Sequence, residues 1–102
     1  MTAAELYTAL KTTTLPVAYA RFEEPTALPY IVYMGDGQGS FLADNTVYHK
    51  QNTYRIEYYF KTKNESTEAD IEKVLTDKGL IYSKSEDIYI EEEDAFEIYY
   101  QI

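Results

Sequence analysis

Apolar and polar residues alternate with a period of two along residues 53–63, TYRIEYYFKTK. Successive side chains of a β-strand point to opposite faces of its sheet, so this period is typical of a strand with one buried face. The set that we expect to be buried is Tyr54, Ile56, Tyr58 and Phe60, and the opposite set is Arg55, Glu57, Tyr59 and Lys61. We therefore take residues 53–63 as the central strand of the fold.

Other short stretches have a similar pattern. Residues 17–22 and 30–34 precede the central strand, and Pro29 lies where proline is tolerated, at the start of a strand. After the central strand, extended segments are expected in the ranges 80–84, 88–90 and 96–102. The sequence thus predicts a four- to five-stranded, mainly antiparallel sheet.

Two segments have apolar residues at helical spacing. Residues 2–11 carry Thr2 as a candidate N-cap and Glu5 at the position that a capping box uses. Residues 67–78 carry Thr67 and Asp70 at the same spacing, and Gly79 follows where a helix C-cap glycine belongs. The apolar stripe of this second helix is Ile71, Val74 and Leu75, and its polar face, which we expect to be solvated, carries Glu68, Glu72, Lys73 and Asp77.

These elements predict a single α+β domain, residues 1–102, in which both helices pack on one face of the sheet. The opposite face is then left partly uncovered. If the apolar alternates face the helices, this open face carries Tyr33, Tyr59 and Tyr99 with Arg55 and other charged residues. A face of mixed aromatic and charged residues is suited to a subunit contact, so these four residues are candidate interface residues.

Composition and charge narrow the function classes. The formal net charge is −9, and the nine basic residues are scattered, whereas proteins that bind a phosphate backbone group their Lys and Arg. There is no cysteine and therefore no disulfide, thiolate metal site or Cys nucleophile. Twelve tyrosines and no tryptophan fit strands and also fit protein interfaces. With no basic leader and no long apolar run, we expect a cytoplasmic protein without a membrane segment.

Three features could suggest chemistry, and each has a simpler interpretation. Residues 35–40, GDGQGS, lack the Lys of a phosphate loop and do not open a helix, which favours a turn or hairpin extension. His49, the only histidine, stands in a polar segment, 49–52, where we expect a bend or bulge. The acids of 91–94 are consecutive, unlike the spaced ligands of a calcium loop, and favour a solvated turn. We predict no catalytic, cofactor or metal site.

Several segments together resemble the tail-completion proteins of long-tailed bacteriophages and prophages, also called tail terminator or tail-to-head joining proteins. The segments are LPYIVY (28–33), ADN (43–45), YRIEYYFKTKN (54–64), a short acidic helix and IYIEEEDAFEIYY (88–100). The resemblance covers nearly the whole chain and rests on the pattern of aromatic strands.

The resemblance implies a structural virion protein. It implies a ring subunit, commonly of a hexamer, that caps the tail tube and contacts the tail tube protein and the head connector. No catalytic residues carry over. DNA would pass through the ring without specific binding, and acids lining the lumen would repel its phosphates. The candidate lumen or rim acids are Asp36, Asp44, Glu91, Glu92, Glu93 and Asp94. Assembly would take place in the host cytoplasm, and the mature location would be the head-tail junction of the virion.

Two alternatives stay open at the level of sequence. An acidic inhibitor or nucleic-acid mimic would occupy a basic site on another protein, with its carboxylates clustered on one surface. A small enzyme would need a pocket around His49 with an acidic partner such as Asp44.

Overall fold

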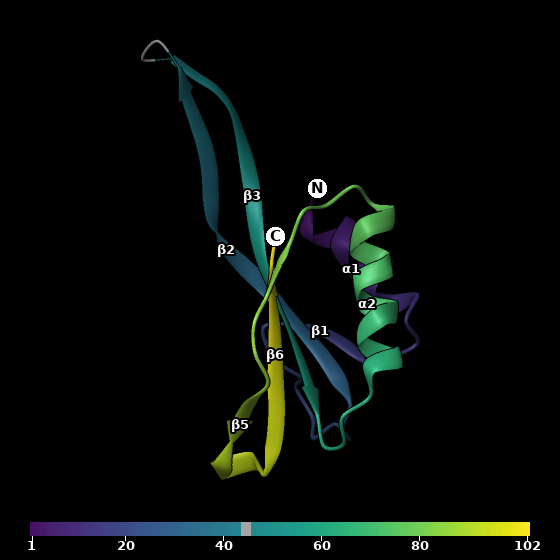
Figure 1. The fold of residues 1–102 in the computed structure, drawn as a ribbon. Coiled ribbons are helices and arrows are strands. Elements are labelled where there is room, and N and C mark those ends of the chain that lie inside the picture. Colours follow the sequence, from purple (N-terminus) through teal and green to yellow (C-terminus); the bar gives the residue numbers. More distant parts are fainter. Residues whose placement is uncertain (44–45) are drawn as a thin grey trace.

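The computed structural model describes residues 1–43 and 46–102, with side chains described for 1–37 and 52–102. It has the predicted mixed α+β fold (Figure 1). The elements in chain order are α1 (Ala3–Lys11), β1 (Val17–Tyr19), β2 (Tyr30–Ala43), β3 (Thr46–Phe60), α2 (Glu65–Asp77), β4 (Ser83–Lys84), β5 (Ile88–Ile90), the 3-10 turn η1 (Glu91–Glu93) and β6 (Ala95–Gln101).

The sheet has six strands in the order β1-β2-β3-β6-β4, and β5 also pairs with β6. Among the strand pairs of the described residues, β1 and β2 run parallel and the others are antiparallel, which agrees with the predicted mainly antiparallel sheet. The strand count exceeds the predicted four or five because β4 and β5 are short and pair with successive parts of the same edge of β6. The predicted strand 80–84 shrinks to its last two residues, since Leu80 still donates a backbone hydrogen bond to Leu75 of α2.

The hairpin formed by β2 and β3 is the longest feature of the molecule. Its pairing runs from Tyr30 opposite Tyr59 to Ala43 opposite Thr46, so the GDGQGS segment extends a hairpin and is not a turn. Two register shifts interrupt the pairing. The second leaves one extra residue in β3 between Val47 and Lys50, which confirms a bulge in the backbone near position 49.

Helix α1 begins as predicted. The Thr2 side chain accepts a hydrogen bond from the Glu5 backbone amide, and the Glu5 carboxylate accepts one from the Thr2 amide. This capping box satisfies two amides that have no partner within the helix.

Helix α2 has a different N-cap from the one predicted. Asn64, not Thr67, accepts hydrogen bonds from the amides of Ser66 and Thr67, so the helix starts two residues before the predicted start. The asparagine side chain reaches both amides at once, which outweighs the Thr67 and Asp70 spacing. The C-cap prediction is confirmed: Gly79 adopts a φ of +72°, and its amide and that of Leu80 bond back into the last turn of the helix.

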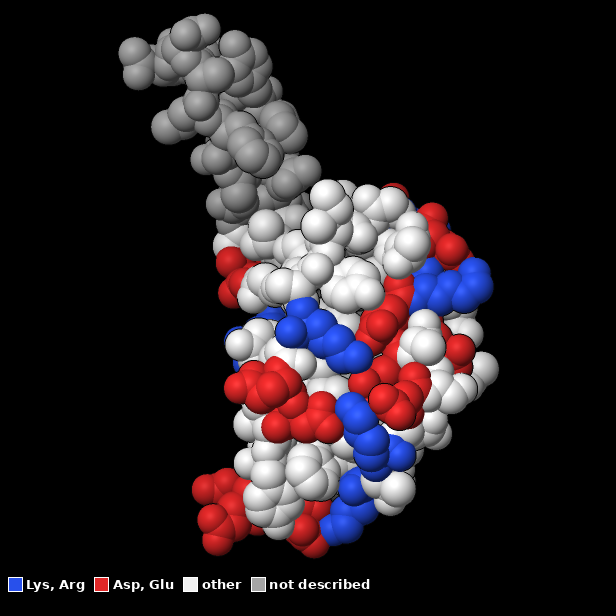
Figure 2. Space-filling model, viewed as in Figure 1, with Lys and Arg blue, Asp and Glu red and all other residues white. Residues whose placement is uncertain are grey.

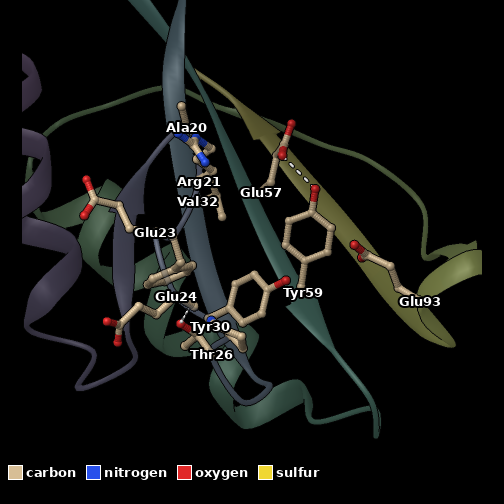
Figure 3. A pocket seen from close by; sticks show the side chains of 12 residues that line it. Ala20, Arg21, Glu23, Glu24, Thr26, Tyr30, Val32, Glu57, Tyr59 and Glu93 are labelled. Carbon is tan, nitrogen blue, oxygen red and sulfur yellow. Dashed lines mark hydrogen bonds between the residues drawn. The ribbon is translucent and has the colours of Figure 1, made fainter.

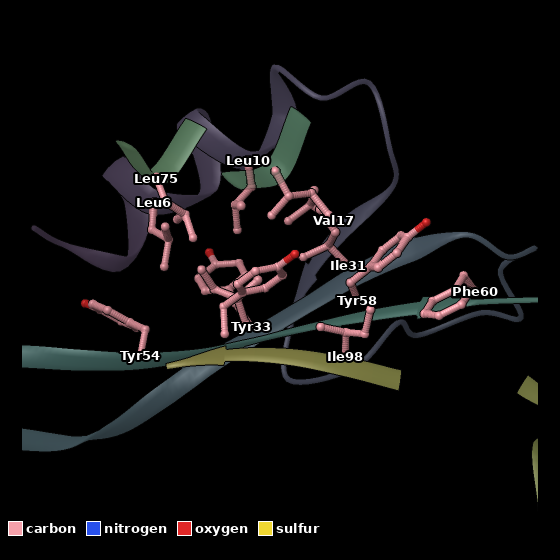
Figure 4. Close-up of a cluster of buried hydrophobic side chains, with 13 residues drawn as sticks. Leu6, Leu10, Val17, Ile31, Tyr33, Tyr54, Tyr58, Phe60, Leu75 and Ile98 are labelled. Carbon is pink, nitrogen blue, oxygen red and sulfur yellow. The ribbon is translucent and has the colours of Figure 1, made fainter. Parts of the chain in front are cut away.

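Both helices cover the same face of the sheet, and the core lies between these two layers (Figures 1 and 4). The predicted buried face of the central strand is confirmed, since Tyr54, Ile56, Tyr58 and Phe60 are all buried. Leu6 and Leu10 of α1, Ile71 and Leu75 of α2, and Ile31, Ile98 and Tyr100 of the sheet complete the layer.

Tyr33 belongs to this core and not to the open face. It lies opposite Ile56 in the β2–β3 register, is only 4% exposed, and donates a hydrogen bond from its hydroxyl to the Ala3 carbonyl. The prediction that Tyr33 is an interface residue is therefore wrong.

Glu68 on α2 also differs from the prediction of a solvated polar face. Glu68 is only 3% exposed. Its Oε2 lies 2.7 Å from Lys63 Nζ, and its Oε1 lies 2.9 Å from Lys84 Nζ. Lys84 pairs with Glu72 as well, at 2.7 Å. On the surface around this network, acidic and basic side chains lie next to one another (Figure 2). The network ties α2 to β4 at the outer edge of the sheet.

Candidate interaction surface

The face of the sheet opposite the helices is the candidate interaction surface. Residues that are paired across neighbouring strands share a face, so the strand register shows which residues lie on this surface. From β2, β3 and β6 it receives Tyr30, Val32, Met34, Arg55, Glu57, Tyr59, Glu97, Tyr99 and Gln101. Three of the four predicted interface residues, Arg55, Tyr59 and Tyr99, thus lie together on this face.

Arg55 is the centre of a compact charged cluster. Its Nε lies 2.9 Å from Glu57 Oε2, and one terminal nitrogen lies 3.7 Å from Glu97 Oε2. The guanidinium carbon lies 3.8 Å from the centre of the Tyr99 ring, within the range of a cation–π contact. Tyr59 donates a hydrogen bond of 2.8 Å to the second oxygen of Glu57. Two carboxylates and one ring therefore hold one guanidinium.

The cluster is only partly solvated, and this changes its titration. Burial raises the pKa of Glu97, with the charge of Glu57 adding to the rise and Arg55 opposing it. Burial also raises the pKa of Tyr59, helped by its hydrogen bond to Glu57. A negative charge on Glu97 or on Tyr59 is thus disfavoured by the surroundings of each group.

A pocket of about 380 Å³ adjoins the cluster (Figure 3). Residues 20–26 form one wall and the rings of Tyr30 and Tyr59 form another, with Glu57 and Glu93 at its border. The 20–26 segment follows β1, where Ala20 turns with a φ of +67° and the Arg21 amide donates to the Tyr19 carbonyl. This turn brings the chain back over the open face.

Ring contacts continue the pocket wall. The Phe22 ring meets Tyr30 edge-on at 5.0 Å, and Tyr30 lies 5.3 Å from Tyr59. Sequence reasoning missed Phe22 and Tyr30 as parts of a surface site. Neither had a signal in the sequence, because the run 30–34 is entirely apolar and no pattern indicated the return of residues 20–26.

The predicted lumen or rim acids separate into groups. Glu91, Glu92 and Glu93 are exposed in η1. Asp94 follows with a φ of +49°, forms an ion pair with Lys61 and accepts a hydrogen bond from Tyr89, which together lower its pKa. Asp36 is exposed and accepts a hydrogen bond from Gln101.

Asp44 and the side chain of His49 lie outside the described residues, so the pocket imagined for a small enzyme has no described geometry. Among the described side chains, no three His, Cys, Asp or Glu are grouped as ligands of one metal ion. Within the same part of the chain, no helix combines the length and the apolar character needed to cross a bilayer. No protein-family model matches the chain, and no curated protein matches its sequence significantly.

Proposed function

We propose that this protein is a structural subunit that assembles with copies of itself into a ring, commonly a hexamer, at the end of a phage or prophage tail. In this role it joins the tail tube protein to the head connector and carries no catalytic site. The resemblance of its aromatic strands to tail-completion proteins is what favours a tail as the place of assembly. The geometry of β2 and β3 favours assembly of the chain with other subunits.

The observation that carries the proposal is the ribbon formed by the outer parts of β2 and β3. Strand β6 pairs with residues 55–60 of β3, where Gln101 lies opposite Arg55 and Phe96 opposite Phe60. Two backbone hydrogen bonds between Tyr54 and Ile102 extend this contact by one residue. On the other side, β1 accompanies β2 only as far as Tyr33. Beyond these points the described chain places neither a strand nor a helix beside the ribbon (Figure 1).

A two-stranded ribbon of this kind is stabilised by contacts with other strands or subunits. A two-stranded hairpin alone is at best marginally stable in water, and both of its edges offer unpaired backbone groups. The eight residue steps from Gly35 to Ala43 span roughly 26 Å at the usual rise of a strand, and the molecule measures 49 × 27 × 26 Å. This reach is enough for the ribbon of one subunit to lie against the next subunit of a ring.

The exposed acids suit a ring through which DNA passes. Glu91, Glu92 and Glu93 are the best candidates for its lumen or rim, because Asp36 and Asp94 already have partners within the chain. Carboxylates repel phosphates within a Debye length of about 8 Å, so DNA passes without being held.

The test adds the protein to purified tail tubes and images the tube ends by electron microscopy. We expect ring density at one end of each tube. A shortened variant replaces residues 39–51 by Asn-Gly, a two-residue turn that connects the paired residues Gln38 and Asn52. This variant should keep its circular dichroism spectrum and melt cooperatively, but leave the tube ends bare.

Bare ends with the native protein would contradict the proposal. If the native protein instead inhibited a basic DNA-binding protein, the acidic mimic would become the better explanation. A shortened variant that still capped the tubes would show that the ribbon is not the assembly element.

A further inference from the structure

We propose that the pocket between residues 20–26 and the rings of Tyr30 and Tyr59 binds an arginine side chain of a partner protein. The inference goes beyond the ring, because it assigns ligand chemistry to one pocket whatever the assembly to which the protein belongs.

The charged residues around the pocket favour a positively charged ligand. Four glutamates contribute to its lining, Glu23, Glu24, Glu57 and Glu93, and Arg21 is the one basic residue of the lining. The carboxylates of Glu57 and Glu93 lie beside the Tyr59 ring (Figure 3). Burial raises the pKa of Tyr30, and the charge of Glu93 raises it further. A positive group that entered the pocket would offset the charge of Glu93.

The aromatic wall of the pocket favours a ligand that is flat as well as positively charged. The faces of tyrosine rings attract cations, and flat cations stack on them. Phe22, Tyr30 and Tyr59 form a continuous aromatic wall beside the carboxylates. A pocket of about 380 Å³ is also large enough for a long side chain and much larger than a bare metal ion needs.

The neighbouring cluster shows that this face already binds a guanidinium. Arg55 stacks on Tyr99 at 3.8 Å while its nitrogens meet the carboxylates of Glu57 and Glu97. The pocket presents the same two elements, rings and carboxylates, and shares Glu57 with the cluster. An incoming arginine would therefore repeat the arrangement of Arg55 one step along the sheet.

Arginine fits this arrangement better than lysine. Its planar guanidinium stacks on a ring and donates to two carboxylates at once, whereas an ammonium is a compact, strongly hydrated charge. Because the chain carries a net charge of −9, a basic segment of a partner is also attracted from a distance.

The test is a two-dimensional amide NMR titration with N-acetyl-arginine amide as the probe and N-acetyl-citrulline amide, its neutral counterpart, as the reference. We expect saturable shifts confined to residues 20–26 and to Tyr30, Glu57 and Tyr59. The citrulline compound should bind at least about tenfold more weakly, which corresponds to the loss of about 1.4 kcal/mol.

Two variants from the same exposed turn sharpen the test. Glu93→Gln removes a carboxylate from the lining of the pocket. Glu92→Gln removes the neighbouring carboxylate, and Glu92 is not part of the lining. Glu93→Gln should weaken binding of the arginine probe several-fold, and Glu92→Gln should change it less than twofold.

Three outcomes would overturn the inference. The first is the absence of saturable shifts in the pocket with the arginine probe. The second is equal weakening by both variants, which would indicate attraction by overall charge only. The third is tighter binding of spermidine at the same residues, which would assign the pocket to a free polyamine and not to a protein side chain.

Discussion

Glu97 is a carboxylate in a place that disfavours its charge. Burial and the neighbouring Glu57 raise its pKa in the folded state, and Arg55 offsets only part of this. Between the pKa of the unfolded chain, about 4.3 for Glu, and the higher folded value, the folded state binds more protons. Its contribution to stability is therefore present at low pH and is lost as the pH rises through the folded pKa.

Glu97→Gln removes this penalty while it keeps the size of the side chain. The variant should have a higher free energy of unfolding than the native protein at pH 7, and the difference should vanish near about pH 4, below the unfolded pKa. Urea titrations at the two pH values measure it. A difference of the same size at both pH values would contradict the assignment.

Glu68 has the opposite behaviour. Burial disfavours its charge most strongly, but the ammonium groups of Lys63 and Lys84 beside its carboxylate outweigh burial and lower its pKa. Its stabilisation is present above the unfolded pKa and is lost as the pH falls through the folded one. Glu68→Ala should cost about 1–3 kcal/mol in thermal or urea unfolding at pH 7, because both lysines lose a partner. Asp70→Ala, exposed on the same helix, should stay within about 0.5 kcal/mol. Equal costs for the two would refute the network.

These residues show where sequence patterns fail. Glu68 looks like any acid on a polar helix face, and its burial is tolerable because Lys63 and the distant Lys84 pair with it. Tyr33 stands in a run of five apolar residues, 30–34, which contains no polar alternate to mark its face. Pairing with Ile56 decides its place in the core. Arg55, Tyr59 and Tyr99 were predictable because charged neighbours mark their strands.

At the scale of elements, β3 organises the core. Ile56→Ala should lower the free energy of unfolding by about 2–5 kcal/mol, because Ile56 is completely buried between the helices and the sheet. Ile81→Ala is the matched control: the same change at a side chain that is 93% exposed should cost less than about 0.5 kcal/mol. Denaturant midpoints compare the two, and similar losses would exclude the observed strand register.

The elements were easier to predict than their ends. Periodicity located both helices and the central strand, since each buries one regular face. It could not locate the N-cap at Asn64, because Thr67 offered an equally valid local pattern. Nor could it show that Tyr30–Ala43 is one strand, because glycines at 35, 37 and 39 suggest a turn, while pairing with β3 keeps the chain extended.

At the scale of the molecule, the two faces of the sheet have different roles. The helices cover one face and complete the core, whereas the other carries the Arg55 cluster and the acidic pocket. The ribbon of β2 and β3 leaves the compact part at one end (Figure 1). Weak contacts through such surfaces become strong when a ring closes, because each later contact forms within one assembly. Monomers in dilute solution are therefore compatible with a ring on a tail.

The mass of the assembly bound to tail tubes tests the ring most directly. The protein is incubated with purified tubes, cross-linked, separated from unbound chains and analysed by mass spectrometry. We expect one closed species that contains a fixed number of copies, commonly six, of the 11.9 kDa chain. Single chains or dimers alone in the tube-bound fraction would contradict the proposed ring.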